Sequence, residues 1–321
     1  MTEMTFTDIP VSEIDLSDTG FRITGNHHDI EPLLASISQY GIVVAPLVLH
    51  KEDKYVVVSG FRRIGAAVRV GLSRITCRVM PAEKESDAAI AAVTENAFSR
   101  ELSASELIRA TGLLLRFMEA KDMAKNAAAI FNRPMNTGYI NTLLGIQAMP
   151  DTVLDLLDHN RISIKACKLL MSVAQDTQAA FLDLFSRIKV SSGIQMEIIT
   201  WTKEICALEA ISPATLIQES PINISEADGH RDMSALGKQF KAFLAQRRFP
   251  VLTAAKEQAR ERINRLGLDA GLQLSVPENF EGMIYTMQME FKSADEFKTR
   301  LNLLTELATL SDFKNLVDGK L

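Results

Sequence analysis

The chain has 321 residues, 47% of them apolar and 23% charged, a globular composition that excludes a disordered polymer and permits sizeable buried cores. With 35 basic and 40 acidic residues the net charge is −5, which excludes a uniformly basic nucleic-acid coat but allows a local basic site. From length alone we expect two or three domains.

The cysteines and the N-terminus indicate an intracellular protein. Cys77, Cys167 and Cys206 lie far apart in the sequence, which argues against a zinc cluster or a disulfide framework and favours a reducing interior. The first four residues show neither the basic region nor the apolar core of a secretory signal. The longest apolar run, near residues 41–49, is too short to span a bilayer. We therefore expect a cytoplasmic protein with no membrane partner.

The first eighty residues predict a small mixed domain of strands and helices. Its expected elements are a strand or turn over 9–16, a helix over 29–40, strands over 46–50 and 55–58, a helix over 61–70 and a strand over 75–80. Asp29 is the expected N-cap of the first helix, and Gly41 and Gly71 are expected to end the two helices. The strands are bounded by polar turns and by Pro81.

From residue 87 the apolar spacing becomes helical and predicts one all-α region with short loops. The expected helices span 87–97, 104–121, 123–131, 137–149, 151–159, 163–173, 178–188 and 194–210, with a short one near Thr215.

A polar, turn-rich stretch from Asn223 to Gly229 is the expected linker to a third region. This region predicts helices over 233–247 and 251–266, strands over 272–276 and 285–291, and a helix from a Ser293–Glu296 capping box to Leu307. We therefore expect an α+β protein with a small mixed N-terminal domain (1–98), an all-helical middle domain (99–221) and a small α+β C-terminal domain (222–321).

The first candidate site is the segment Ser59-Gly60-Phe61-Arg62-Arg63, where an apolar strand runs through a glycine into a helix. Free N–H groups and the helix dipole make such a start an anion site. Two arginines in the first turn oppose the dipole unless a polyphosphate neutralises them. Residues 54–82 also hold six cations and no acidic residue. A solvated amphipathic helix with distant acidic partners is the alternative.

A second candidate is the segment from Glu95 and Asn96 to Arg100. The oxygens of Glu95 and Asn96 are of the kind that Mg²⁺ prefers beside a phosphate, and Arg100 is placed to complete a phosphate clamp. A helix end with a capping asparagine gives the same pattern. His27 and His28 are adjacent, which is more often a plain polar loop than a metal site.

A third candidate is a helix-turn-helix over residues 123–150, with the turn at 132–136. Polar side chains at the start of its second helix can bond to base edges or phosphates, and cations downstream can contact phosphates. The predicted DNA-binding residues are Asn136, Thr137, Tyr139, Asn141, Thr142, Arg161, Lys165 and Lys168. An ordinary helical hairpin remains the alternative, because this helix carries no Lys or Arg.

Taken in order, these segments resemble the ParB family of partition proteins over about residues 8–175. The resemblance rests on Ile9-Pro10-Val11, on Gly41 and Pro46 after the first helix, on Val58 to Arg63 as the G-E-R-R box, on Glu95-Asn96…Arg100 as the E-N-x-x-R box, on Leu102 to Glu106, and on Met149-Pro150 with Arg161-Ile162-Ser163.

The resemblance implies an N-terminal domain that binds CTP with Mg²⁺, a helical domain that binds a palindromic DNA site, and a C-terminal domain that holds a homodimer. It also implies a CTP-gated clamp on double-stranded DNA, a ParA-type ATPase as partner, and association with the nucleoid or a plasmid. The nucleotide-binding residues would be Ser59, Gly60, Phe61, Arg62, Arg63, Glu95, Asn96 and Arg100, with Glu95 and Asn96 facing the metal.

Three departures from the family pattern bear on activity. Phe61 replaces the Glu of the G-E-R-R box, which the family associates with hydrolysis, and Ala45 replaces a frequent Gln. Neither side chain can orient water or a metal, so we expect nucleotide binding rather than CTP hydrolysis, and whether this chain is a CTPase stays open. Only about eight residues precede the resembling region, which argues against the usual ParA-contacting peptide.

The strand over 285–291 places Tyr285, Met287, Met289 and Phe291 on one face, too small a unit to bury itself. A second copy would cover that face, and a two-fold dimer would match a palindromic site; packing on this chain's own helices over 233–266 is the alternative.

Two other functions stay in view. One is a transcriptional regulator on the same scaffold that does not slide. The other is an enzyme of the sulfiredoxin-like or nuclease type, which Cys77, far from Gly60, and the absence of carboxylates over 54–82 argue against.

Overall fold

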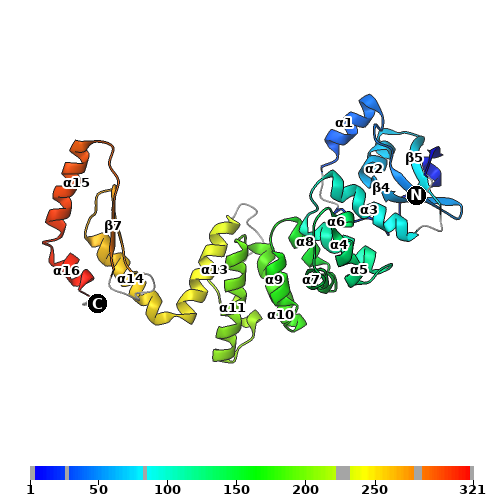
Figure 1. Ribbon diagram of the computed structural model, residues 1–321. Coiled ribbons are helices and arrows are strands. Elements are labelled where there is room, and N and C mark those ends of the chain that lie inside the picture. Colours follow the sequence, from blue (N-terminus) through cyan, green and yellow to red (C-terminus); the bar gives the residue numbers. More distant parts are fainter. Residues whose placement is uncertain (1–3, 26–28, 82–84, 222–231, 278–283, 319–321) are drawn as a thin grey trace. The chain divides into compact units, whose positions relative to one another are not determined.

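A computed structural model describes residues 4–25, 29–81, 85–221, 232–277 and 284–318 (Figure 1). The fold class is α+β, as the sequence predicts. Contacts divide the chain into two compact units, Met1–Ile199 and Thr200–Leu321, and the division falls inside helix α11 (Ser192–Glu209). None of the helices described is long and apolar enough to cross a membrane.

A five-stranded mixed sheet forms the first part of unit one. Its strands are β1 (Thr5–Pro10), β2 (Ile14–Asp15), β3 (Leu47–Lys51), β4 (Lys54–Ser59) and β5 (Arg74–Met80), and their order across the sheet is β1-β5-β3-β4-β2. The β1–β5 and β3–β4 pairs are antiparallel, whereas β3–β5 and β2–β4 are parallel. The predicted β3–β4 hairpin is confirmed, because apolar strands flank a polar turn.

Three helices accompany the sheet: α1 (Glu31–Tyr40), α2 (Phe61–Val70) and α3 (Glu85–Ser99). α1 packs on α2, and α3 packs on β4. The predicted bounds of α2 are confirmed. α1 begins at Glu31 with Ile30 as its N-cap, so the assignment of Asp29 as N-cap is wrong. The Asp29 carboxylate accepts the N–H of Glu31 at 3.0 Å. Ile9, Val57 and Ile64 lie in the buried core between these layers.

Helices make up the rest of unit one: α4 (Ala104–Leu115), α5 (Ala120–Lys125), α6 (Ala127–Phe131), α7 (Thr137–Gln147), α8 (Thr152–Asp158), α9 (Ile164–Leu170) and α10 (Gln175–Arg187). The single helix predicted over 104–121 is wrong. The N–H groups of Phe117 and Met118 both bond to the carbonyl of Leu114, and Glu119 turns to extended backbone before α5. The helix predicted over 123–131 is likewise divided at Asn126.

The predicted boundary between residues 98 and 99 falls inside unit one. Helix α3 packs on the sheet, on α4 and on α6, and so joins the mixed and helical parts into one compact body. The three-domain division therefore stays a prediction. The expected linker from Asn223 to Gly229, the start of the third domain and the pair His27-His28 lie outside the described residues.

Unit two contains α12 (Pro213–Gln218), α13 (Met233–Arg248), α14 (Pro250–Arg265), β6 (Leu272–Ser275), β7 (Thr286–Met289), α15 (Ala294–Leu307) and α16 (Ser311–Val317). The predicted break at Pro250 is confirmed. In the predicted capping box, Ser293 accepts the N–H of Glu296 at 3.1 Å, but the Glu296 carboxylate accepts the N–H of Lys292 instead of that of Ser293.

The antiparallel β6–β7 hairpin packs on helices of its own chain. Leu274 is buried with Ala259 of α14 and Leu316 of α16, and Tyr285 and Met287 pack against them. The hydroxyl of Tyr285 donates to the carbonyl of Leu316 at 2.7 Å. For Tyr285 and Met287, the structure therefore supports the alternative that the strand packs on helices of its own chain.

Candidate functional sites

The start of α2 has the backbone geometry of an anion site. Strand β4 ends at Ser59, Gly60 turns with φ 95°, and α2 begins at Phe61. A Cβ at residue 60 would lie 3.0 Å from the Cβ of Pro46 and 3.1 Å from its Cα, so this turn requires glycine. Among the described residues no side chain caps α2 and no acidic residue stands in its first turn. The N–H groups of that turn are therefore available to a ligand.

A cavity of 310 Å³ opens at this helix start. Phe21, Thr24 and Leu33 line one side of it. Seven of the eight residues predicted to bind nucleotide also line it: Ser59, Gly60, Phe61, Arg62, Arg63, Glu95 and Asn96. The structure thus brings together two segments that lie more than thirty residues apart in the sequence.

Glu95 holds two arginines at the edge of this cavity. One carboxylate oxygen accepts Arg63 Nη2 at 2.9 Å, and the other accepts Arg78 Nη2 at 2.6 Å. Arg63 Nη1 also donates to the carbonyl of Val44 at 2.7 Å. Arg63 therefore fastens the loop after α1 to α3, and Glu95 occupies the place that an anionic ligand of Arg63 would take.

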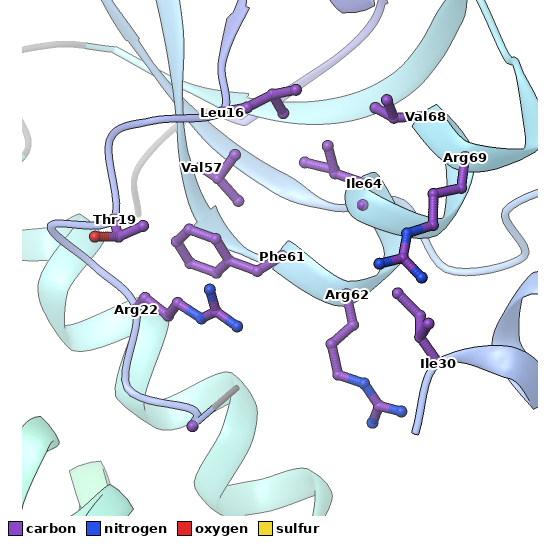
Figure 2. Close-up of a pocket in the computed structure, with 12 residues that line it drawn as sticks. Leu16, Thr19, Arg22, Ile30, Val57, Phe61, Arg62, Ile64, Val68 and Arg69 are labelled. Atoms are coloured by element: carbon purple, nitrogen blue, oxygen red, sulfur yellow. The ribbon is translucent and has the colours of Figure 1, made fainter. Parts of the chain in front are cut away.

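Beside this cavity lies a second one, of 440 Å³, that shares Phe61 and Arg62 with it. Figure 2 shows the guanidinium groups of Arg22, Arg62 and Arg69 around one opening, with the Phe61 ring next to Arg22. Within the described residues no ion pair joins any of these three arginines to a carboxylate. Arg62 Nη2 donates to the carbonyl of Asp29 at 2.8 Å. Three guanidinium groups that no described carboxylate pairs with therefore line this cavity.

Arg22 is the most constrained of the three arginines. Its Nε is buried and has no hydrogen-bond partner in the described structure, and its guanidinium lies 5.7 Å from the centre of the Phe61 ring. Burial lowers the pKa of Arg22 below its ordinary value, and repulsion by Arg109 adds to the effect. A half-buried guanidinium that no described carboxylate pairs with gains from an anion placed beside it.

Arg100, the eighth predicted residue, lines neither cavity. Its Nη1 and Nη2 donate to the two carboxylate oxygens of Glu106 at 2.7 and 2.5 Å. The Glu106 side chain is 3% exposed and also accepts the N–H of Ser103 in the capping box of α4. Burial by itself would raise the pKa of Glu106, but the bonds from Arg100 and Ser103 bring it below its ordinary value. As arranged, Arg100 fastens α3 to the start of α4.

The predicted Mg²⁺ ligands do not fit a metal as they stand. Both oxygens of Glu95 hold guanidinium groups, and the amide nitrogen of Asn96 donates to the carbonyl of Ala92 in its own helix at 2.8 Å. No group of three or more His, Cys, Asp or Glu side chains gathers into a metal site in the described residues. Mg²⁺ stays a prediction, and no step below depends on it.

The structure gives the sulfiredoxin-like alternative no support at Cys77. Cys77 is buried in β5, and burial raises the pKa of its thiol to about 11, so the thiol is protonated at neutral pH. A nucleophilic thiolate is not available there.

In the segment predicted as a helix-turn-helix, α7 follows a turn at residues 132–136 and packs against α4 and α5. Ile140, Leu143 and Ile146 are buried on its inner face, and Asn141 is exposed on the outer one. The side chain of Asn136 caps the helix by accepting the N–H of Tyr139 at 2.8 Å, and the hydroxyl of Thr142 donates to the carbonyl of Gly138. Asn136 and Thr142 thus already have partners within the helix.

The remaining predicted DNA-binding residues differ in exposure. Lys165 and Lys168 are exposed on α9, and Thr137 and Tyr139 are half-buried at the start of α7. Arg161 is half-buried, and its Nη1 is enclosed and without a hydrogen-bond partner in the described structure, so its contact with a phosphate stays a prediction.

Four arginines near these sites were missed as ligand candidates: Arg22, Arg69, Arg78 and Arg133. The acid-free stretch over 54–82 was the signal for Arg69 and Arg78. Arg22 lies in a loop whose sequence gives no such signal, and Arg133 lies in the turn before α7, where its guanidinium is 6.0 Å from the centre of the Tyr139 ring.

One family model and several solved structures are similar to parts of this chain. A family model of the ParB N-terminal domain matches residues 1–97. Similar solved structures include C-terminally truncated chromosome-partitioning protein ParB from Caulobacter crescentus complexed with CTP-gamma-S, at 20% identity and TM-score 0.27 over 57% of this chain and 99% of that one. The same protein complexed to the centromeric parS site gives 18% identity and TM-score 0.33 over 56% and 91%. A Pnob8-like ParB-N domain gives 16% identity and TM-score 0.36 over 67% and 88%. No curated protein matches the chain.

Proposed function

We propose that this chain, whose residues 1–97 belong to the ParB N-terminal domain family, is a partition protein that binds DNA and whose hold on DNA is gated by a nucleotide. CTP is the nucleotide that the family resemblance implies. The observation that carries the proposal is the uncapped start of α2, which faces two adjoining cavities walled by Arg22, Arg62, Arg63 and Arg69.

A triphosphate satisfies this site in three ways. Its oxygens accept the free N–H groups of the first turn of α2, and its charge neutralises arginines that otherwise oppose the helix dipole. It also gives the Arg22 guanidinium an anionic partner, which no carboxylate of the described residues supplies. Arg62, exposed and bonded to one carbonyl, is free to turn to a phosphate, whereas Arg63 must first leave Glu95.

Phe61 supports binding without turnover. Its ring packs at the edge of the sheet core and lies against Arg22, so it places a hydrocarbon where hydrolysis would need a group that orients water. The proposed role is therefore a nucleotide-gated switch, with CTPase activity absent or slow.

Helix α7 is the proposed DNA-reading element. Residues 123–150 contain no Asp or Glu, although about one residue in eight of the whole chain is acidic. A surface without carboxylates can approach the phosphate backbone without repulsion. The exposed Lys165 and Lys168 on the neighbouring α9 are the proposed phosphate contacts.

A homodimer through unit two is the proposed assembly. Tyr285 and Met287 of the strand face are covered by this chain, but helix α15 leaves Phe297, Leu301 and Leu303 between 36% and 47% exposed. A second copy that covers this helix would remove that apolar surface from water and would supply the two-fold symmetry of a palindromic site.

The test is a calorimetric titration of the full chain with CTP, ATP, GTP and UTP. CTP-selective binding is the expected result. A transcriptional regulator on the same scaffold would bind DNA and none of the four nucleotides, and that outcome would contradict the proposal. A partner ATPase of the ParA type stays a prediction that a pull-down with a purified ParA would check.

A further inference from the structure

The segment over residues 123–150, which the proposed function assigns to DNA binding, has one basic residue near the start of α7. Among residues 123–150 only Lys125 and Arg133 are basic, and α7 carries no charged residue at all. Lys125 ends α5, whereas Arg133 lies in the turn that leads into α7. Any charged contact made from the start of α7 must therefore come from Arg133.

The structure holds Arg133 in place without neutralising it. Its guanidinium lies 6.0 Å from the centre of the ring of Tyr139, the third residue of α7, within the range of a cation–π contact. No ion pair joins Arg133 to a carboxylate in the described part of the chain. The flanking residues are also fixed, since Asn132 has φ 53° and donates its amide to the carbonyl of Ala97, and Met135 is buried.

The neighbouring helix surface suits a base edge better than a phosphate. Asn141 is exposed on the outer face of α7, and Gly138 adds no side chain there, so the start of the helix can approach a groove floor closely. A guanidinium fork matches the O6 and N7 acceptors of guanine, which form the commonest specific arginine contact in the major groove. Stacking on an aromatic ring orients such a fork in advance and reduces the rotamer freedom lost on binding.

We propose that Arg133 reads a guanine in each half of the DNA site, with Tyr139 as the residue that positions its guanidinium. This inference rests on the DNA binding proposed above. It names a base contact, and so differs from the phosphate contacts assigned to Lys165 and Lys168.

The experiment selects sites from a random duplex DNA pool with the full chain, either wild type, Arg133→Ala or Lys125→Ala. The wild type is expected to enrich a two-fold motif. Arg133→Ala should lose the preference for guanine at one position of each half while the other positions persist, and should bind the wild-type site roughly 5- to 150-fold more weakly for each contact. Lys125→Ala removes the same charge from the same unit and should keep the motif. Circular dichroism and thermal melting establish that each variant is folded.

Two conservative variants separate base reading from charge. Arg133→Lys keeps the charge but not the fork and should lose the same preference. Tyr139→Phe keeps the ring and should keep the guanine preference, whereas Tyr139→Ala should weaken it.

The outcomes distinguish this inference from the function on which it rests. If the wild type enriches no motif, sequence-specific DNA binding fails and the inference fails with it. If the wild type enriches a motif that Arg133→Ala retains, only the inference is overturned. A uniform loss across all sequences, with the slope of log affinity against log salt reduced by about one, would make Arg133 a phosphate contact and would also overturn it.

Discussion

Arg62 and Arg63 are neighbours in sequence, yet only the Arg63 side chain forms an ion pair in the described structure. Arg63 joins Glu95 and the carbonyl of Val44, so it helps to hold the fold as well as the site. Arg62 is exposed and has one carbonyl partner. Substitution of Arg63 would confound ligand loss with structural loss, and Arg62 is the cleaner probe of phosphate binding.

We predict that Arg62→Ala weakens CTP binding by at least about tenfold and leaves the melting temperature unchanged. A charge-assisted hydrogen bond contributes about 1.5–3 kcal/mol, and 1.4 kcal/mol is tenfold in affinity. Titration calorimetry measures the affinity. Lys54→Ala, which removes one charge from β4 outside both cavities, is the control and should bind as the wild type does. Equal affinity in the two variants would count against the phosphate assignment.

Arg100 is predicted to stabilise the fold. Arg100→Ala leaves the nearly buried Glu106 carboxylate without its guanidinium, and we expect the free energy of unfolding to fall by about 1–3 kcal/mol. Arg187→Ala removes an exposed i,i+4 pair with Asp183 and should cost only about 0.3–0.5 kcal/mol. Urea denaturation compares the two variants. If Arg100→Ala unfolds like the wild type and only nucleotide affinity falls, Arg100 is a ligand after all.

The same pair predicts a pH dependence. The folded pKa of Glu106 lies below its ordinary value of 4.5, so its ionised form stabilises the fold above that value, and this stabilisation is lost as the pH falls through the folded pKa. We expect the free energy of unfolding of the wild type to fall on acidification below about pH 4.5 more steeply than that of Glu106→Gln. Parallel curves for the two proteins would show that Glu106 does not contribute.

At the scale of elements, the join between β4 and α2 depends on one glycine. Gly60→Ala places a Cβ 3.0–3.1 Å from Pro46 at φ 95°, and we predict destabilisation by about 1–3 kcal/mol together with weaker CTP binding. Gly65→Ala, within α2 with no atom near its Cβ position, should stabilise the protein by about 0.5–1 kcal/mol. Thermal melts of both variants give the comparison, and a shift of the same sign in both would refute the argument.

The elements that could be predicted from the sequence are those whose ends are indicated by nearby residues such as glycines and polar turns. The β3–β4 hairpin and α2 were predicted closely because apolar runs meet polar turns and glycines at their ends. The end of α4 was missed because Phe117 and Met118 continue the apolar pattern and no glycine or proline marks the break. The short helix α16 was missed because its burial depends on contact with α14.

The candidate site divides in the same way. The glycine turn into α2 could be predicted because it is a local feature, and the family resemblance added Glu95 and Asn96, which line the same cavity. The pairings of Glu95 with Arg63 and Arg78 could not, since they join residues 32 and 17 positions apart and depend on how α3 packs on the sheet. For the same reason nothing local indicated that Arg22 would reach this cavity or that Arg100 would turn to Glu106.

For the whole molecule, the exposed apolar side chains of α15 predict association. We expect the wild type to be a dimer at micromolar concentration and Leu301→Glu to shift it to a monomer, because burying a leucine contributes about 1.5–3 kcal/mol and a two-fold interface contains the residue twice. Asn302→Glu, an exposed polar position of the same helix, adds the same charge and should remain a dimer. Sedimentation velocity measures the state, and a monomeric wild type would exclude this assembly.

The central claim is that a nucleoside triphosphate binds at the start of α2, and hydrogen exchange of the full chain with and without CTP tests it most directly. The account predicts slower amide exchange in peptides that cover residues 59–66, 21–25 and 94–99, which line the two cavities, and unchanged exchange over 294–307 in α15. Saturating CTP without protection over 59–66, or with protection confined to other segments, would contradict it.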